Sequence, residues 1–523
     1  DLTAADREHV TTRLRSTEFA DRRLNVEAPV DWSSERWTLD TSEDLAVVRA
    51  AYTALDRDDF RWTDVLQLRC LEPDLFDANR HLASTGGSPT GQRMWERAKQ
   101  VIPGGSMLLS KNADQTLPGE WPAYFSGAEG CVVRDLNGRS YLDFYYMGLG
   151  TNTLGYRAPE VERAVQLALA RGNMSTLLAP EEVFLAERLV DMHPWSDMVR
   201  FTRSGGEAVA VAVRIARAAS GRDGVIFCGY HGWHDWYLAA NLRSGQALDE
   251  HLIPGLEPLG VPQGLAGTSM PFTINDVETF ERLMADHDPG VIVMEVMRNT
   301  PPEPGFLEMV RDAATRQGAV LIFDECTSGF RETFGGLHLA MGVNPDLVVL
   351  GKALGNGYAV AAAVGTRAVM EHATRAFVSS TFWTERVGAA AGLATLAAME
   401  QKRSWELLPT IGERVSRLVS DAAASQGVPL RISGLRALAF YDFGDGQHSA
   451  ALRTVLSYAM LERGFLAGAA FYASLAHTDE LLPLYGEAVN ESMLTVRQCW
   501  EDPERIPGVL GSGIAGSGFG RLN

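Results

Sequence analysis

Two stretches decide the fold of this chain: residues 319–325, AVLIFDE, and residues 346–352, DLVVLGK. Each is a short apolar run that ends at a charged side chain, Asp324 in the first and Lys352 in the second. Runs of this kind are typical of strands that are buried on both faces of a parallel sheet. Because ligands bind beyond the carboxyl ends of such strands, we expect both side chains to lie at a ligand-binding edge.

Similar runs stand on either side of these two stretches. They alternate with amphipathic helical segments such as 206–220 and 304–318. The other apolar runs are MVRFTR at 198–203, GVIFCG at 224–229, GVIVMEV at 290–296 and AVAAAVG at 359–365. This alternation predicts an α/β fold with a large, mostly parallel and doubly wound sheet.

The remaining sequence suggests three further parts. We expect a short helical N-terminal extension, in which apolar residues of SEDLAVVRAAYTAL (42–55) recur every three or four positions. We also expect a smaller α+β domain that is built from both ends of the rest of the chain. The predicted boundaries are 1–83 for the extension, 84–147 and 400–523 for the two parts of the smaller domain, and 148–399 for the large domain.

Composition narrows the class of function. The net charge of −19 argues against a nucleic-acid partner, because phosphate backbones require a basic surface. We find no apolar run long enough for a membrane span and no signal peptide in the polar opening residues, so we expect a cytoplasmic protein. The five cysteines form no CxxC pair, and we therefore expect neither a metal site nor a disulfide framework.

Lysine is rare in this chain. Of the 47 basic residues only four are lysines, namely Lys99, Lys111, Lys352 and Lys402. A mechanism that needs an amine nucleophile therefore has few candidates. Lys352 stands out because it follows a buried strand and is flanked by glycines that let a ligand approach closely.

Polar features also follow the other apolar runs. Gly205 and Gly206 open a helix, so that their N–H groups can face a phosphate, although a simple tight turn gives the same pattern. Tyr230 could lie flat on an aromatic cofactor, or it could belong to an aromatic cluster at the edge of the core. The nearby His231 and His234 lack a carboxylate or cysteine at the spacing of a metal site.

Asp324 requires a partner, because a carboxylate at the end of an apolar strand is costly to bury alone. A protonated pyridine nitrogen would be such a partner, and the charge on that nitrogen makes the ring an electron sink. The alternatives are a helix N-cap or a salt bridge to Arg331.

In this order, these features resemble the class III, fold-type I enzymes that depend on pyridoxal 5'-phosphate (PLP), and among them the branch of glutamate-1-semialdehyde aminomutase. The resemblance covers roughly residues 92–498. It is carried by IPGG (102–105), VRFTRSGGEA (199–208), YHGWHDW (230–236), LIFDECTSGFR (321–331) and LGKALGNGY (350–358).

The resemblance implies a role for each site residue. Lys352 would form the Schiff base with PLP, Asp324 would pair with the pyridine nitrogen, and Tyr230 would stack on one face of the ring. Cys326 would pack near the other face, where such enzymes often have Val. The remaining implied contacts are Gly205 and Gly206 with the phosphate, Thr381 with the phosphate of the partner subunit in a homodimer with shared active sites, and Asn299 with the ring hydroxyl.

Two positions depart from the pattern of the family. Gly206 stands where the phosphate turn commonly has Thr or Ser, so one hydroxyl contact is missing. Lys111 stands near the position of an arginine that holds the substrate carboxylate in the aminomutase, and lysine lacks the bidentate fork of arginine. The segments 248–258 and 379–386 are more similar to the branch of polysaccharide and modified-sugar pathways.

The N-terminal extension resembles another kind of enzyme. Residues 7–14 (REHVTTRL) and 60–68 (FRWTDVLQL) are similar to the C-terminal end of spore-coat-type sugar cytidylyltransferases. The nucleotide-binding half of such an enzyme has no counterpart here. We therefore expect no nucleotide transfer by this piece, which could be the remnant of a larger fused protein or a docking element.

The leading hypothesis is an aminotransferase that moves an amino group from a small-molecule amine donor to the carbonyl of a sugar-like or polar aldehyde or ketone, with ping-pong kinetics. An aminomutase that moves the group within one molecule is an alternative, as is a PLP-dependent elimination on a sugar. A non-catalytic scaffold is the alternative from a different class.

Overall fold

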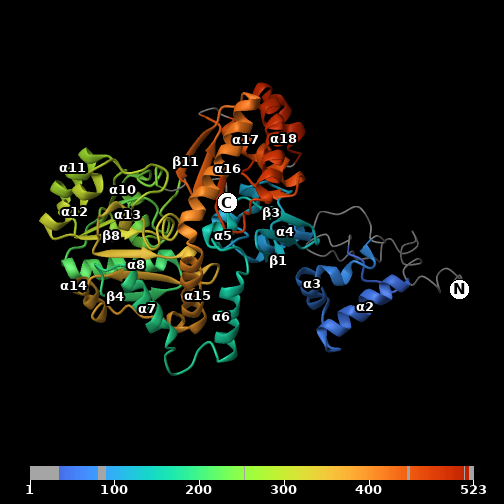
Figure 1. Cartoon of the computed structure of the whole chain (residues 1–523), viewed down its shortest axis with the longest axis horizontal. Coiled ribbons are helices and arrows are strands. Elements are labelled where there is room, and N and C mark those ends of the chain that lie inside the picture. Colours follow the sequence, from blue (N-terminus) through green and yellow to red (C-terminus); the bar gives the residue numbers. More distant parts are fainter. Residues whose placement is uncertain (1–34, 81–89, 252–253, 445–447, 512, 517–523) are drawn as a thin grey trace, which may run out of the picture. The chain divides into compact units, whose positions relative to one another are not determined.

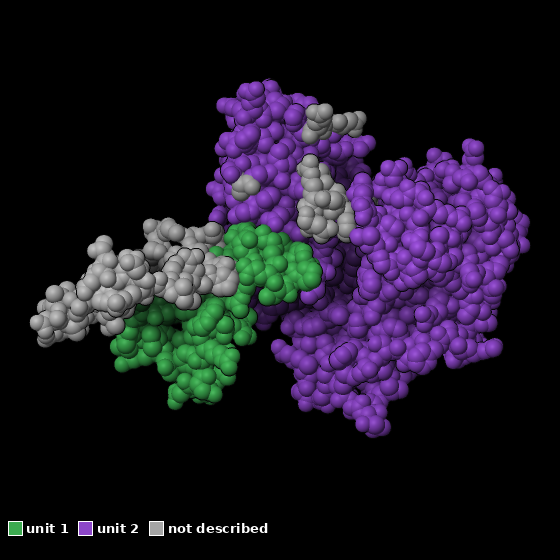
Figure 2. All heavy atoms as spheres, turned by 180° about the vertical axis from the view of Figure 1, so that it is seen from behind, with its two compact units in different colours: residues 1–106 green, residues 107–523 purple. Residues whose placement is uncertain are grey.

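The structure is a computed structural model that describes residues 35–80, 90–251, 254–444, 448–511 and 513–516. The chain forms two compact units, residues 1–106 and 107–523 (Figure 2). The boundary predicted between residues 83 and 84 lies outside the described residues, as does the segment 7–14. No helix among the described residues is long and apolar enough to cross a membrane.

The first unit is helical. Helix α2 (Ser42–Leu55) confirms the helix predicted over the same residues. A capping box fixes its start, because the Thr41 hydroxyl accepts from the Asp44 N–H and the Asp44 carboxylate accepts from the Thr41 N–H, both at 3.1 Å. The other helices among its described residues are α3 (Trp62–Leu71), the 3₁₀ turn η3 (Pro73–Phe76) and α4 (Thr90–Val101).

The second unit contains the predicted large sheet (Figure 1). Its strands lie in the order β4 (Met198–Thr202), β10 (Ala361–Gly365), β9 (Leu347–Leu350), β8 (Val320–Asp324), β7 (Val291–Glu295), β5 (Val225–Cys228) and β6 (Ser269–Pro271). All six predicted strands are confirmed, and only β6 has no counterpart in the sequence analysis. The strands from β9 to β6 are parallel, which confirms a mostly parallel sheet.

Strand β10 is the exception, because it runs antiparallel to both β9 and β4. Only residues 351–360 separate the end of β9 from the start of β10. A parallel crossover needs a dozen or more residues, usually with a helix, so this short connection can only return the chain in the opposite direction. Lys352 lies in that connection.

Side chains of the central strands alternate between two hydrophobic clusters, one on each face of the sheet. Ile292 and Phe323 belong to one cluster, whereas Val293 and Ile322 belong to the other. The layers that cover these faces include the helices α8 (Gly205–Ser220), α12 (Phe306–Gln317) and α15 (Arg386–Lys402) (Figure 1). Burial on both faces explains why the runs are continuously apolar rather than alternating.

A smaller α+β part completes the second unit. One antiparallel sheet contains β11 (Arg431–Leu435), β12 (Leu438–Asp442) and β14 (Ala470–Tyr472). Its helices are α16 (Ser404–Gln426), α17 (Ser449–Glu462) and α18 (Leu481–Glu501). A second sheet joins β1 (Phe125–Glu129), β2 (Val132–Asp135) and β3 (Ser140–Asp143) to β13 (Phe465–Leu466). Because β13 pairs with β3, distant parts of the chain build this smaller part, as predicted.

Candidate active site

The predicted site residues follow strands whose carboxyl ends share one edge of the large sheet. Strands β5, β7, β8 and β9 are parallel neighbours, and β4 has the same direction because it is antiparallel to β10. Tyr230 follows β5, Asp324 ends β8, Lys352 follows β9 and Gly205 follows β4. The topology therefore brings these four positions to the same edge.

Lys352 begins the 3₁₀ turn η8 (Lys352–Gly355) with a left-handed φ of 42°. This conformation costs a side chain about 1–2 kcal/mol, so the surrounding structure must hold it. The amine Nζ donates a hydrogen bond of 2.8 Å to Oγ1 of Thr327. Burial lowers the pKa of the Lys352 amine, Cys326 opposes this effect, and the positive charges of Arg298 and Arg331 add to it. These effects therefore shift the amine toward its neutral, nucleophilic form.

Two of the other lysines are tied up elsewhere. Lys99 pairs with Glu96 at 2.7 Å and Lys402 pairs with Glu160 at 2.8 Å. Lys111 is exposed in the first part of the second unit. Among the four lysines, Lys352 is thus the one that stands beside Asp324 at the strand ends.

Asp324 is buried, with 5% of its surface exposed, and its partner is His231. Oδ2 of Asp324 lies 2.8 Å from Nδ1 of His231, and Oδ1 accepts from the N–H of Cys326 at 3.1 Å. Nε2 of His231 lies 3.0 Å from the carbonyl oxygen of Cys228, which fixes the ring. His231 therefore orients the carboxylate, a role that the sequence analysis missed.

The salt bridge from Asp324 to Arg331, weighed as an alternative, is wrong. Arg331 instead donates from Nε to the carbonyl of Thr327 at 2.6 Å and from Nη2 to the carbonyl of Gly150 at 2.5 Å. Within the described residues, no group of three or more His, Cys, Asp or Glu side chains could hold a metal ion.

Glycines bring the strand-end loops together at the start of α8. A Cβ on Gly205 would lie 2.7 Å from Sγ of Cys326, and a Cβ on Gly232 would lie 2.9 Å from Cα of Gly206. Ser204 caps the helix and Glu207 closes the capping box. In the described part of the chain, the N–H groups of Gly205 and Gly206 have no acceptor, so they are available to an anion.

Tyr230 is 36% exposed and its main chain is fixed by a buried carboxylate. Its N–H donates to Oε2 of Glu295 at 3.0 Å. The guanidinium of Arg298 lies 5.8 Å from the centroid of the Tyr230 ring and pairs with Glu295 at 3.4 Å. Glu295 is the main cause that raises the pKa of Arg298, so the guanidinium stays charged beside the aromatic ring.

The remaining predicted residues are exposed. Thr381 begins the 3₁₀ turn η10 (Thr381–Thr384), and its carbonyl accepts from the hydroxyl of Thr384 at 2.9 Å. Asn299 lies in the loop after β7, four residues beyond Glu295. The contact of Thr381 with a partner subunit and the contact of Asn299 with the ring hydroxyl stay predictions.

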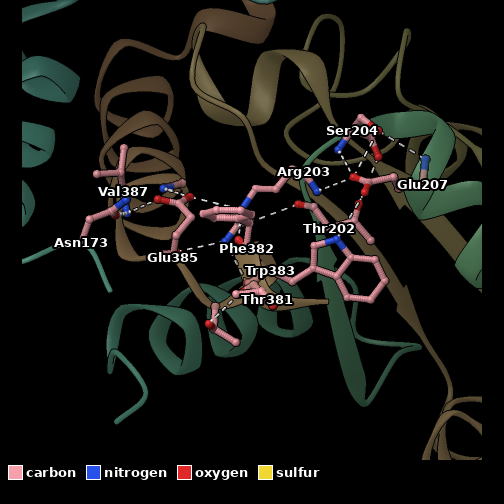
Figure 3. A network of polar contacts seen from close by, with 12 residues as sticks. Asn173, Thr202, Arg203, Ser204, Glu207, Thr381, Phe382, Trp383, Glu385 and Val387 are labelled. Carbon is pink, nitrogen blue, oxygen red and sulfur yellow. Dashed lines mark hydrogen bonds and ion pairs between the residues drawn. The ribbon is translucent and has the colours of Figure 1, made fainter. Parts of the chain in front are cut away.

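Arg203 joins the start of α8 to the η10 turn, as Figure 3 shows. Its guanidinium donates to the carbonyl oxygens of Phe382 (2.8 Å), Trp383 (2.8 Å) and Glu385 (3.0 Å). Its Nε also lies 3.2 Å from the Glu385 carboxylate, and its own N–H donates to Glu207 at 3.0 Å. This network, which the sequence analysis missed, links the turn at Gly205 to the turn that carries Thr381.

A cavity of about 530 Å³ lies within the second unit. Its aromatic lining comes from Trp121, Tyr124, Phe125, Tyr141, Tyr145, Tyr146 and Tyr156, and Lys111 also lines it. Part of the wall is the turn Met147–Gly150, in which four successive residues have left-handed φ values of 41°, 67°, 63° and 75°. This turn also accepts the hydrogen bond from Arg331, whose positive charge acts on Lys352.

Comparison with known proteins identifies the family. The family described as "Aminotransferase class-III" matches residues 118–470. The chain belongs to the class III aminotransferases. Such an enzyme uses an amine donor and a carbonyl acceptor.

Curated relatives of this class III aminotransferase have different substrates in their names. The chain is 35% identical to a glutamate-1-semialdehyde 2,1-aminomutase of Desulfovibrio desulfuricans (74% of this chain, 96% of the relative). It is 31% identical to a 2'-deamino-2'-hydroxyneamine transaminase of Streptomyces kanamyceticus (71% and 92%). It is 30% identical to a 3-aminobutyryl-CoA aminotransferase of Cloacimonas acidaminovorans (77% and 97%).

Solved structures agree with the fold of this class III aminotransferase. An omega-transaminase from Sphaerobacter thermophilus has a TM-score of 0.69 at 25% identity and covers 80% of this chain and 100% of its own. A transaminase with PLP bound has a TM-score of 0.69 at 26% identity, with 77% and 97% covered. PLP is therefore the cofactor, and the fold is that of a fold-type I PLP enzyme.

The residues at the strand ends fit PLP. Asp324 presents a buried carboxylate, Lys352 presents an amine, and the glycines at the start of α8 leave room for a phosphate. Nδ1 of His234, beside Gly206, is buried without a hydrogen-bond partner in the described part of the chain. A buried nitrogen without a partner beside a helix N-terminus is compatible with a phosphate site.

Proposed function

We propose that the chain is an aminotransferase that passes an amino group from an amine donor to the carbonyl of a sugar-like or otherwise polar aldehyde or ketone. The hydrogen-bonded Lys352 amine beside the Asp324–His231 pair carries the proposal. The polar acceptor is supported by the cavity, because its tyrosines and tryptophan combine apolar faces with hydrogen-bonding groups. The name of the neamine transaminase, a relative at 31% identity, points to the same class of acceptor.

When bound, PLP supplies an aldehyde that takes up the amino group and a ring that serves as an electron sink. We assign to Asp324 the pairing with the pyridine nitrogen, while His231 holds the carboxylate in place. Lys352 moves a proton on and off the substrate carbon, since burial favours the neutral amine that can accept it. Thr327 keeps Nζ in position through its hydroxyl.

A spectroscopic experiment tests the transfer step. The visible absorption band of the holoenzyme should fall when excess L-glutamate is added, and it should return when a keto-sugar is supplied. Lys352→Ala should abolish the change with glutamate, whereas Lys402→Ala serves as the matched control because Lys402 pairs with Glu160 on the surface. A band that returns with simple keto acids but with no keto-sugar would overturn the proposed acceptor.

An aminomutase is the second candidate, favoured by the 35% identity to a glutamate-1-semialdehyde 2,1-aminomutase. Such an enzyme would isomerise its substrate without an external amine donor. Incubation with an ¹⁵N-labelled amino-aldehyde separates the two activities. Retention of the label within the product molecule supports the mutase, and its appearance on a second carbonyl compound supports the transferase.

The sites and assembly are proposed together with this function. We assign cofactor contacts to Gly205, Gly206 and Tyr230, and we assign Asn299 to the ring hydroxyl. In a homodimer, Thr381 would contact the phosphate that is bound in the partner subunit. The expected branch of polysaccharide or modified-sugar pathways and the cytidylyltransferase-like origin of residues 1–83 belong to the same proposal. Sedimentation velocity of the holoenzyme tests the dimer. The contact of Thr381 is tested by cofactor loss in a Thr381→Ala variant, which is expected only in a dimeric protein.

A further inference from the structure

His234 occupies the space beside Gly206 that a side chain at position 206 would face. A Cβ on Gly206 would lie 3.5 Å from Cε1 and 3.6 Å from Nδ1 of His234, which are ordinary contact distances. The segment Tyr230–His234 reaches this point because Gly232 packs its Cα against the main chain of Gly206. The imidazole thus borders the start of α8 on the side where position 206 has no side chain.

Nδ1 of His234 is a buried polar atom that lacks a hydrogen-bond partner among the described residues. His234 is the N-cap residue of the short helix α9 (Asp235–Leu238), yet its side chain forms no capping hydrogen bond. The ring is held by stacking on Trp233, with 4.3 Å between centroids and 22° between planes. A buried nitrogen without a partner is costly, so a ligand that supplied the partner would stabilise this ring.

The surroundings favour an anion as this ligand. The N–H groups at the start of the 16-residue helix α8 provide the positive end of a helix dipole. The nearest carboxylate, that of Glu207, is already bound by the N–H groups of Arg203 and Ser204, each at 3.0 Å. Asp235 is the other charged neighbour of the imidazole. The start of α8 is therefore the positively polarised neighbour of this imidazole, on the side of Gly206.

We propose that His234 donates a hydrogen bond from Nδ1 to the phosphate of PLP and replaces the side-chain hydroxyl that Gly206 lacks. The proposal rests on the placement of this phosphate at the start of α8, as set out under the proposed function. Burial lowers the pKa of His234 and so favours the neutral ring, and the proposed hydrogen bond uses the tautomer with the proton on Nδ1.

The test measures, by absorbance, how tightly the apoprotein binds PLP and how tightly it binds pyridoxal, which lacks the phosphate. His234→Ala should weaken PLP binding about 10- to 100-fold, the range of one charge-assisted hydrogen bond, and should leave pyridoxal binding within about two-fold. His234→Asn keeps a donor near the position of Nδ1 and should lose less. Equal weakening of both ligands, or unchanged PLP binding, would overturn the proposal.

A second variant keeps the test sharp if His234→Ala disturbs the loop. Gly206→Thr restores a hydroxyl; a Cβ at position 206 meets no clash, and His234→Ala removes the ring that a longer side chain would face. In the His234→Ala background, Gly206→Thr should recover PLP affinity at least five-fold, and an absence of recovery counts against the proposal. If the unaltered apoprotein binds neither PLP nor pyridoxal, the proposed function itself fails; if it binds both equally, only the phosphate site fails.

Discussion

Adding one methyl group at Gly205 should destabilise the protein, whereas the same change at the adjacent Gly206 should not. A Cβ at Gly205 would lie 2.7 Å from Sγ of Cys326, but the nearest atom to a Cβ at Gly206 is 3.5 Å away. The sulfur has little room to retreat, because it also lies 3.4 Å from the position of a Cβ on Gly351. The main chain of Cys326 is held by its hydrogen bond to Asp324.

The magnitude follows from comparing the two neighbours. Both Gly→Ala changes gain a similar, small amount of helix propensity at the start of α8, so this gain cancels in the difference. Overpacking at Gly205 costs about 1–3 kcal/mol. Gly205→Ala should therefore melt about 2–6 °C below Gly206→Ala, taking ~2 °C per kcal/mol for a domain of this size.

The assay is thermal unfolding of the apoprotein, followed by circular dichroism, for the two single variants and for each in a Cys326→Ala background. Removal of the sulfur should make the two glycine variants equal within about 1 °C. The reasoning is refuted if Gly205→Ala melts with Gly206→Ala in the original background. It is also refuted if the deficit at Gly205 persists after the sulfur has been removed.

Three further predictions concern residues that hold the candidate site in place or stabilise the fold. Thr327→Val should slow the glutamate half-reaction about 2- to 10-fold, because it removes the 2.8 Å acceptor of Lys352 Nζ, whereas Thr327→Ser should retain most of the rate. Stopped-flow absorbance measures both rates, and equal rates would contradict the role of the hydroxyl. Arg203→Gln should lower unfolding stability by about 2–4 kcal/mol and speed hydrogen exchange at residues 381–385, while the exposed Arg367→Gln should stay within about 0.5 kcal/mol; unchanged exchange would remove Arg203 from this role. Burial lowers the pKa of His477 to about 4, so the unfolded chain binds the proton first and stability falls as the pH decreases from about 6.5 to about 4; His477→Gln should flatten this fall in urea titrations, and an identical pH profile would refute the assignment.

Much of the site was predictable because its residues stand at strand ends. The apolar runs are buried on both faces, and this burial leaves a local signal that predicts the strands before any contact is known. The same signal together with the scarcity of lysine singled out Lys352 as a candidate, and the cost of burying a carboxylate singled out Asp324. These inferences need only the sequence near each residue.

The partners of these residues could not be predicted in the same way. His231 lies 93 positions from Asp324, and the acceptors of the Arg203 guanidinium in and directly after the η10 turn lie 179 to 182 positions away. Nothing in a local pattern distinguishes His231, which supports a carboxylate, from His234, which borders the start of α8. Folding alone places one ring at Asp324 and the other at Gly206.

By itself, the sequence determined the order of strands and helices, the positions where polar side chains meet the sheet edge, and the family to which these motifs belong, since each is written in the residue types of short segments. The tertiary structure alone decided the reversed direction of β10, the His231–Asp324 pair, the Arg203 network and the unpartnered nitrogen of His234. The physical reason is that these features depend on contacts between segments far apart in the chain, where packing and desolvation act on groups that no local pattern relates.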